Sequence, residues 1–235
     1  MRTRIATTVT IAALSAFALA CEGRTSGFLI SGPAGGVRVR LLNALTSSSA
    51  LSLNIDGQVA ASGIPFGGAS QYQSLTIGSH RLQVVSATSG TTLVDFTRDF
   101  GSEGAFSLVP APGLSQSGAL LITDDPTPAT GQARVRVVHV AAAPGAVSVY
   151  VTAPTADLAS STPVVASLAF GSASAYVSVG PGTYRVRVTP AGDPSQILLD
   201  SGNLTVGAGT VRTLLLTDAP GGGLPTNLSI VSDAN

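Results

Sequence analysis

One stretch of this chain occurs twice, and this internal repeat constrains the fold more than any other feature. Residues 168–189 match residues 64–85, which lie 104 positions upstream, at nine of 22 positions. The shared segment reads Phe-Gly-x-Ala-Ser-x-Tyr, at 66–72 and again at 170–176. An Arg-Val-Arg segment also recurs, at 38–40 and 134–136, with an offset of 96. The chain is therefore a duplication, and the two halves must fold in the same way.

Alternating apolar and polar residues indicate strands throughout both halves. Residues 37–41 and 51–55 alternate with a period of two, and Asp56-Gly57 after them is a strong hairpin signal. No window shows a sustained helical pattern. Each half has about seven or eight short strands separated by turn residues, which is typical of a sandwich. The sequence predicts an all-β fold of two tandem antiparallel β-sandwich domains, immunoglobulin-like or transthyretin-like Greek keys.

The domain boundaries follow from composition and from the repeat. We expect the first β-sandwich repeat at 37–126, a Pro- and Thr-rich linker at 127–132 and the second β-sandwich repeat at 133–235. The offset grows from 96 to 104 because the second half has eight extra residues. They fall in the region 152–164, which predicts a longer loop there.

The N-terminus predicts export. Arg2 and Arg4 precede an apolar stretch that ends at Ala20, so residues 1–20 are interpreted as a signal peptide. Cys21 is the single cysteine of the chain, and its position resembles the lipidation site of a bacterial lipoprotein signal. Residues 21–36 would then be a tether. The alternative is ordinary cleavage after Ala18-Leu-Ala20. The predicted location is the cell envelope, as an outer-membrane or cell-surface lipoprotein; otherwise the protein is secreted or periplasmic.

Composition argues against several functions. The chain has 12 basic and 12 acidic residues, and removal of the signal peptide leaves 10 against 12, a net charge of −2. Such a chain has no electrostatic footprint for nucleic acid. One cysteine and two separated histidines cannot supply the usual zinc site. We predict no catalytic, cofactor-binding or metal-binding residues and no cofactor; Cys21 is the one predicted modification site, which would join the protein to the membrane through its lipid.

For some residues, a functional interpretation stands beside the structural one. The pairs Arg38/Arg40, Arg134/Arg136 and Arg185/Arg187 would hold an anionic glycan or phosphate if they formed a stripe, but we expect a solvated strand face. Carboxylates that would suit Ca²⁺ lack the spacing of a calcium loop and are interpreted as turn and edge residues: Asp95, Asp99, Glu103, Asp124 and Asp125. His139 would serve as a general base, but no nucleophile motif accompanies it, and a structural role is favoured.

Strand periodicity assigns directions to the repeated residues. Tyr184, Val186 and Val188 should face the core, and Arg185 and Arg187 should face water. His80 takes the place of Tyr184 in the first half. The Phe-Gly pairs are expected to fill the core at bends. On this interpretation the repeated motif specifies a fold unit.

Four segments of the second half resemble a known family. They are Arg-Val-Arg-Val-Val-His ending at His139, the strand 147–151, the segment 170–176, and Pro-Gly-Thr-Tyr-Arg-Val-Arg-Val at 181–188. Together they are similar to the bacterial domain-of-unknown-function family 4397, over 133–235 well and over 37–126 more loosely. The resemblance implies an all-β sandwich in an exported protein and no particular activity. We therefore expect a non-catalytic surface binding or spacer module with an envelope protein or glycan as partner; the alternatives are a lipoprotein that binds a glycan or small solute and, more distantly, a hydrolase.

Overall fold

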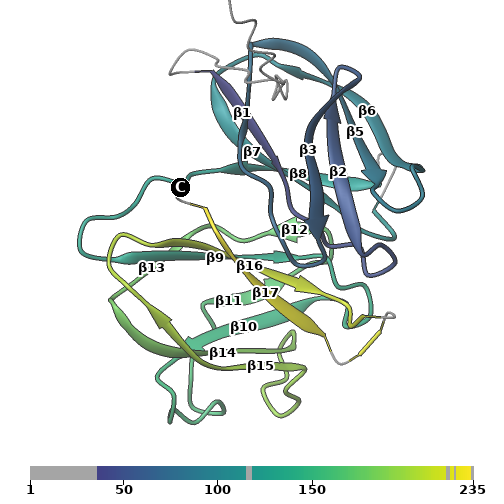
Figure 1. Cartoon of the computed structure of the whole chain (residues 1–235). Helices are drawn as coiled ribbons and strands as arrows, with labels where there is room; N and C mark the ends of the chain where they lie inside the picture. The colour runs from purple at the N-terminus through teal and green to yellow at the C-terminus, as the bar shows by residue number, and fades with distance from the viewer. Residues whose placement is uncertain (1–35, 115–117, 221–222, 225, 234–235) are drawn as a thin grey trace, which may run out of the picture.

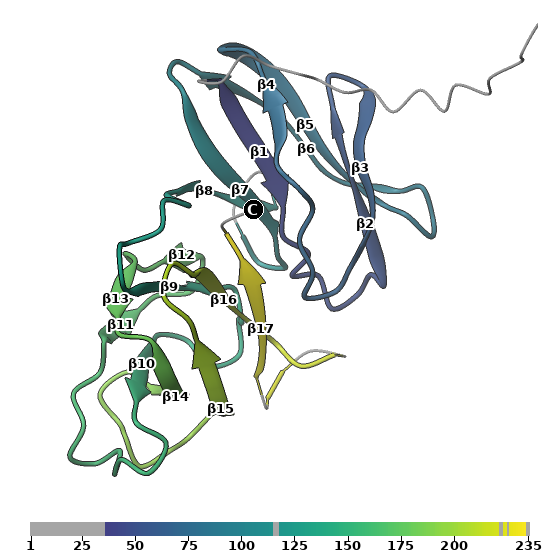
Figure 2. The same cartoon turned by 60° about the vertical axis from the view of Figure 1, so that its left-hand side comes forward.

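The computed structural model describes residues 36–114, 118–220, 223–224 and 226–233, all of which form strands, turns and loops without a helix. Figures 1 and 2 show the two halves as separate layered units side by side. The predicted all-β sandwich fold is confirmed. No helix in the described part is long and apolar enough to cross a membrane. The predicted signal peptide and Cys21 lie outside the described residues.

The first half consists of two four-stranded sheets. Its strands are β1 (Val37–Leu41), β2 (Ala50–Ile55), β3 (Gln58–Pro65), β4 (Gln73–Leu75), β5 (Gly78–Ser86), β6 (Thr92–Phe100), β7 (Gly104–Pro110) and β8 (Ala119–Asp124). Sheet I has the order β4-β1-β7-β8, and sheet II has the order β3-β2-β5-β6. Strands β1 and β7 are parallel, whereas every other pair is antiparallel.

The second half repeats this topology. Its strands are β9 (Ala133–His139), β10 (Val147–Thr152), β11 (Val165–Leu168), β12 (Ser172–Ala173), β13 (Val177–Val179), β14 (Gly182–Pro190), β15 (Leu199–Val206), β16 (Val211–Thr217) and β17 (Asn227–Ser232). Sheet III has the order β12-β9-β16-β17, with β13 also on β9, and sheet IV has the order β11-β10-β14-β15. The parallel pair recurs as β9 and β16.

Each sandwich has its own apolar core. In the first half Val37, Val39 and Leu41 of β1 pack against Leu53 of β2 and Leu82 of β5, all fully or almost fully buried. The equivalent residues of β9, β10 and β14 form the second core. Val186 and Val188 face this core, as the periodicity of their strand predicted.

A third apolar cluster lies between the halves. It joins Leu42, Val109 and Ile122 of the first sandwich to Val138 and Leu215 of the second. These residues alternate with the core-facing ones, so they lie on the outer faces of sheets I and III. The two sheets therefore pack outer face against outer face, and the duplication builds an interface as well as two cores.

This packing corrects the predicted solvated arginine face. Arg38 is exposed, but Arg40 and Arg136 are only 1% and 2% exposed, because the opposite half covers them. Arg187 is buried for a different reason. The long loop after β10 folds over sheet IV, and Arg187 Nη2 donates to Thr152 Oγ1 at 2.7 Å and to the Ala156 carbonyl at 2.8 Å.

Two local predictions have clear structural outcomes. Asp56 and Gly57 both have positive φ, 51° and 79°, and form the tight turn between β2 and β3. Tyr184 is half-buried at the start of β14, and its hydroxyl donates to the Gly180 carbonyl at 2.9 Å. His80 contacts the corresponding Thr76 carbonyl through Nε2 at 3.0 Å. Each residue thus contacts the backbone four positions before it, at the start of β14 in one half and of β5 in the other.

Candidate functional site

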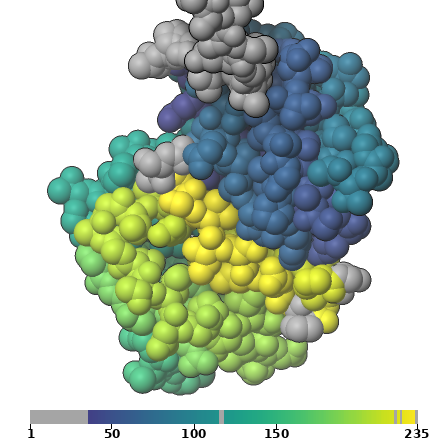
Figure 3. All heavy atoms as spheres, in the orientation of Figure 1, coloured from purple at the N-terminus to yellow at the C-terminus, as the bar shows by residue number. Residues whose placement is uncertain are grey.

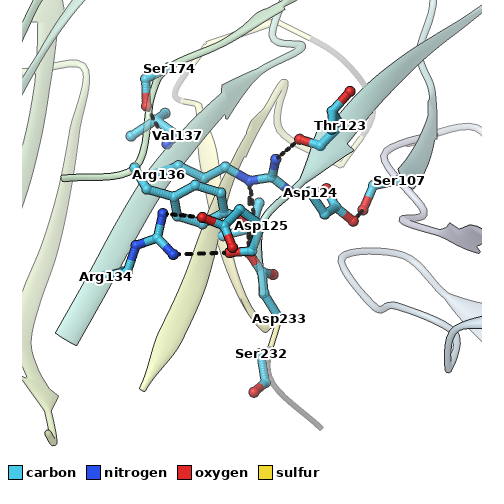
Figure 4. Close-up of polar contacts among 12 residues, drawn as sticks. Ser107, Thr123, Asp124, Asp125, Arg134, Arg136, Val137, Ser174, Ser232 and Asp233 are labelled. Atoms are coloured by element: carbon cyan, nitrogen blue, oxygen red, sulfur yellow. Dashed lines mark hydrogen bonds and ion pairs between the residues drawn. The ribbon is translucent and has the colours of Figure 1, made fainter. Parts of the chain in front are cut away.

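Four buried charged residues meet where sheets I and III pack together. Arg40 and Asp124 come from the first sandwich, and Arg136 and Asp233 come from the second; none is more than 6% exposed. Figure 4 shows the part of this cluster around Arg136, with Asp124 and Asp233 beside it. Because isolated buried charges are very costly, the pairing of these four side chains decides whether the interface is stable.

The arginines cross between the halves. Arg40 Nη2 donates to Asp233 Oδ1 at 2.7 Å and Nη1 donates to the Ser232 carbonyl at 2.9 Å. In the opposite direction, Arg136 Nη2 donates to Asp124 Oδ1 and Nη1 donates to the Thr123 carbonyl at 3.0 Å. Each guanidinium therefore holds the end of the last strand of the other sandwich. The arrangement has approximate two-fold symmetry.

Hydroxyl groups complete both halves of the cluster. Arg40 Nε donates to Ser107 Oγ, and Arg136 Nε donates to Thr213 Oγ1, both at 2.8 Å. These two hydroxyls in turn donate to Asp124 Oδ2 and Asp233 Oδ2, each at 2.6 Å. The second oxygen of each carboxylate is thus occupied by its own sandwich, and the first oxygen by the opposite one.

The repeated tyrosines close the cluster. Tyr72 donates its hydroxyl to Asp124 Oδ2 at 2.6 Å, and Tyr176 donates to Asp233 Oδ2 at 2.7 Å. The guanidinium carbons of Arg40 and Arg136 each lie 4.7 Å from the centre of the tyrosine ring of the same half. Desolvated cation–π contacts of this kind contribute on the order of 2 kcal/mol each.

The pKa shifts follow from this geometry. Burial alone would raise the pKa of Asp233, but Arg40 and the hydroxyl donors Thr213 and Tyr176 outweigh it, and the pKa lies below its ordinary value. Burial raises the pKa of Tyr72 and of Tyr176, so both phenols stay protonated and act as donors. For Arg40, burial opposes the charge, yet Asp233, the largest favourable influence, keeps the pKa above its ordinary value.

Other residues of the repeated motif also lie at this interface. Ser70 Oγ accepts the Leu41 amide, and Ser174 Oγ accepts the Val137 amide, both at 2.9 Å. These bonds place the bend next to the arginine strand. The motif therefore builds the contact between the halves, and the expectation that it mainly fills the two cores is corrected.

The Phe-Gly bends meet the opposite sandwich directly. Gly67 has φ 73°, and a Cβ there would lie 2.2 Å from Ser229 Oγ on β17. Gly171 has φ 72°, and a Cβ there would lie 2.8 Å from Leu114 in the loop between β7 and β8. Glycine is required at both positions by the backbone angle and by the close approach of the other half.

His139 is fully buried at the end of β9, at the position that Asn43 has after β1. Its Nε2 lies 2.6 Å from the Gly145 carbonyl, and its ring contacts Phe170 edge-on. Its Nδ1 has no hydrogen-bond partner among the residues that the structure describes. Burial is the main cause that lowers the pKa of His139, although the Gly145 contact raises it. The residue is therefore held neutral inside the protein, in a setting that suits a structural histidine.

The remaining sequence candidates are dispersed. Asp95 pairs with Arg81 at 2.5 Å on the outside of sheet II, and Asp125 pairs with Arg134 at 2.8 Å beside the linker, which lowers the pKa of Asp125 to about 2. Arg185 pairs with Asp200 at 2.6 Å. Within the described ranges, no group of three His, Cys, Asp or Glu side chains is arranged to hold a metal ion.

The sequence interpretation missed the crossed pairs. It treated Asp124 as a turn carboxylate and did not single out Asp233. A signal was present, because Asp124 ends β8 and Asp233 directly follows β17, the last strand of each repeat. Arg40 and Arg136 likewise occupy equivalent positions in the first strand of each repeat. Chemically, the cluster is saturated: each carboxylate oxygen has a donor, and the arrangement is suited to fixing two domains.

Comparison with known proteins supports the family resemblance. The family described as Domain of unknown function (DUF4397) matches residues 37–150, which comprise the first sandwich, the linker and the start of the second. No curated protein matches the chain. Among solved structures, a family-26 carbohydrate-binding module from Eubacterium rectale, in complex with maltoheptaose, is 10% identical, with a TM-score of 0.26, over 81% of this chain and 95% of the module. That likeness carries no argument about activity.

Removal of one crossed arginine should loosen the interface. We expect Arg40→Met to lower the free energy of unfolding by about 3–5 kcal/mol, because it leaves Asp233 charged and buried. Arg38→Met, two residues away on the same strand but exposed, removes only the contact of its guanidinium with the Tyr72 ring at 5.5 Å and should lower it by at most about 1 kcal/mol. Urea unfolding followed by circular dichroism measures both. Equal effects of the two substitutions would contradict the role assigned to Arg40.

Acid should weaken the protein in two stages. The pKa of His139 is below its ordinary 6.5, so the unfolded chain binds a proton more readily and stability falls as the pH drops below about 6.5. The pKa of Asp233 is below 3.8, so its contribution is present above that pH and is lost as the pH falls further. We expect His139→Asn, which copies Asn43, to remove the first stage and keep the second, as measured by melting temperature between pH 7 and about 2. A first stage that persists in this variant would exclude His139 as its source.

Proposed function

We propose that this protein is an exported, non-catalytic module of the cell envelope that is anchored by lipid on Cys21. In this proposal two tandem copies of the family domain act together as one rigid surface binding or spacer unit. The observation that carries the proposal is the crossed pairing of Arg40 with Asp233 and of Arg136 with Asp124. A spacer or scaffold needs a fixed angle between its domains, and buried reciprocal ion pairs supply one.

The chemistry of the buried residues favours a structural role over catalysis. A catalytic carboxylate or histidine needs access to substrate and a pKa suited to proton transfer. Asp124 and Asp233 are saturated by donors from both halves, and His139 is enclosed. The four buried charged side chains of this cluster therefore hold the halves together.

Ligand capture is the second candidate, and one observation favours it. A hollow of about 270 Å³ is lined by residues from both halves, Gly67 to Gln71 on one side and Ile230 to Ser232 on the other. It is small for a pocket that encloses a solute, since such pockets usually measure about 300–1,000 Å³. The hollow therefore has the form of a surface groove and not of an enclosed binding site.

Distance measurements between the halves test rigidity. Spin labels at Thr97→Cys on β6 and Asn203→Cys on β15, both exposed, would be introduced in a Cys21→Ser background. We expect a single narrow distance distribution in pulsed electron resonance, which broadens when Arg40→Met and Arg136→Met are combined. Arg38→Met is the matched control and should leave it narrow. A broad distribution in the parent protein would reject the rigid unit.

The anchor is tested separately. We expect the mature protein extracted from membranes to have the intact mass of a chain that begins at an acylated Cys21. The Cys21→Ser variant should move to the soluble fraction while it keeps the same melting temperature. An unmodified mass in the native protein would support ordinary secretion instead.

A further inference from the structure

Strand β17 has one open edge. Among the described strands it is paired with β16 alone. The Asp233 amide donates to the Val211 carbonyl at 2.9 Å, so Asp233, Val231 and Ser229 turn their backbone groups toward β16. In such a ladder alternate residues turn their backbone groups away from the partner. The N–H and C=O groups of Leu228 and Ile230 therefore point to the open side. The Ser232 carbonyl points to the same side and already accepts a hydrogen bond from Arg40 Nη1.

At Leu228 and Ile230 this edge has no charged residue, proline or bulge that would block strand addition, although Arg40 occupies the Ser232 carbonyl at its end. Proteins block sheet edges with charges, proline, bulges or very short strands. Among the other long edge strands, β3 contains Pro65 and register shifts, β6 carries Asp95, Arg98 and Asp99, and the β14–β15 ladder is shifted. Strand β8, the equivalent edge in the first half, also runs in continuous register, but it ends in the charged Asp124. Strand β17 reads Asn-Leu-Ser-Ile-Val-Ser and runs in continuous register.

Two hollows flank the open edge and meet at Ile230. One of about 420 Å³ lies between β15 and β17 and is lined by Leu198, Leu228 and Thr226 among others. The other is the 270 Å³ hollow against Gly67 to Gln71 of the first sandwich. Ile230 lines both and is 42% exposed. Figure 3 shows the C-terminal residues in yellow at the surface, along the boundary between the halves.

We propose that β17 accepts a single extended peptide from a partner protein, which adds to sheet III as a further strand. Alternate apolar side chains of the peptide would enter the hollow beside Leu198 and Leu228. The side chains that alternate with them would face Gly67 and Gly68 and would have to be small, because the backbone lies close to the edge there. The groove is continuous with the established interface, because Val231 belongs to the apolar cluster between the halves.

The position of the first half favours this occupant over a second copy of the chain. Arg40 contacts the Ser232 carbonyl and Gly67 approaches Ser229, so the first sandwich stands beside this edge. Edge-to-edge pairing would bring a whole second sandwich against it, whereas a single extended peptide needs far less space. The proposal refines the proposed binding module by naming its class of partner. It predicts that the amides of Leu228 and Ile230 exchange with solvent quickly in the free protein and slowly in the complex.

The test uses a fluorescein-labelled heptapeptide of alternating serine and valine with the full-length protein. We expect saturable binding by fluorescence anisotropy. Ile230→Pro should weaken it about tenfold or more, because proline removes an outward N–H while the bonds of Ser229 and Val231 to β16 remain. Ile230→Val, which keeps the N–H, is the matched control and should bind within about threefold of wild type.

A peptide that is N-methylated at every residue should not bind, because it has no backbone N–H left to form the ladder. Exchange protection of Leu228 and Ile230 in the wild-type protein gives a second measurement that does not depend on the proline variant folding. Absence of saturable binding, equal binding by Ile230→Pro and Ile230→Val, or protection confined to another edge overturns the proposal. A peptide-free dimer whose contact protects β17 also overturns it. If the spin labels give a narrow distance distribution but the peptide does not bind, only the proposed strand addition at β17 is rejected. The proposal of a rigid two-domain module is then unaffected.

Discussion

The structure depends on two buried ion pairs that neither sandwich can complete by itself. Arg40 and Asp124 lie in the same half, but each carboxylate oxygen that accepts a guanidinium Nη2 receives it from the opposite half. Separation of the sandwiches would expose the apolar cluster around Leu42 and Val138 and break both pairs together. Partial opening is therefore disfavoured, since it would leave charges neither paired nor fully hydrated. This reciprocity turns two domains that have their own cores into one cooperative unit.

The repeat acquires a different meaning in this setting. Under an approximate two-fold axis, each contact between the copies occurs twice, as Arg40 meets Asp233 and Arg136 meets Asp124, so both copies need the same chemistry at the interface. Tyr72 and Tyr176, with Gly67 and Gly171, are placed where each half meets the other. Recurrence in the sequence thus marks a contact between copies. Inspection of one copy alone would assign the same residues to the interior of a single domain.

Sequence reasoning recovered the features that local physics decides. Alternation located the strands and gave Val186 and Val188 their inward direction, and Asp56-Gly57 marked a turn with the required backbone angles. It could not separate Arg38 from Arg40, which have the same residue type on the same face of one strand. Their difference in exposure arises from the position of the second half. The buried site escaped prediction for this reason, since its partners come from strands more than 190 residues apart in one case.

The two copies agree where they touch and differ where they face outward. The longer loop of the second half covers sheet IV and buries Tyr150, Leu158 and Arg187, whereas Gln83, which corresponds to Arg187, is only half-buried on sheet II. A symmetric interface fixes the relative position of the sandwiches without specifying a partner. Specific recognition therefore has to come from asymmetric surfaces and from edges that the interface leaves open. Strand β17 satisfies that requirement, because Arg40 anchors the carbonyl of Ser232 at its end while the backbone of Leu228 and Ile230 stays available to another chain.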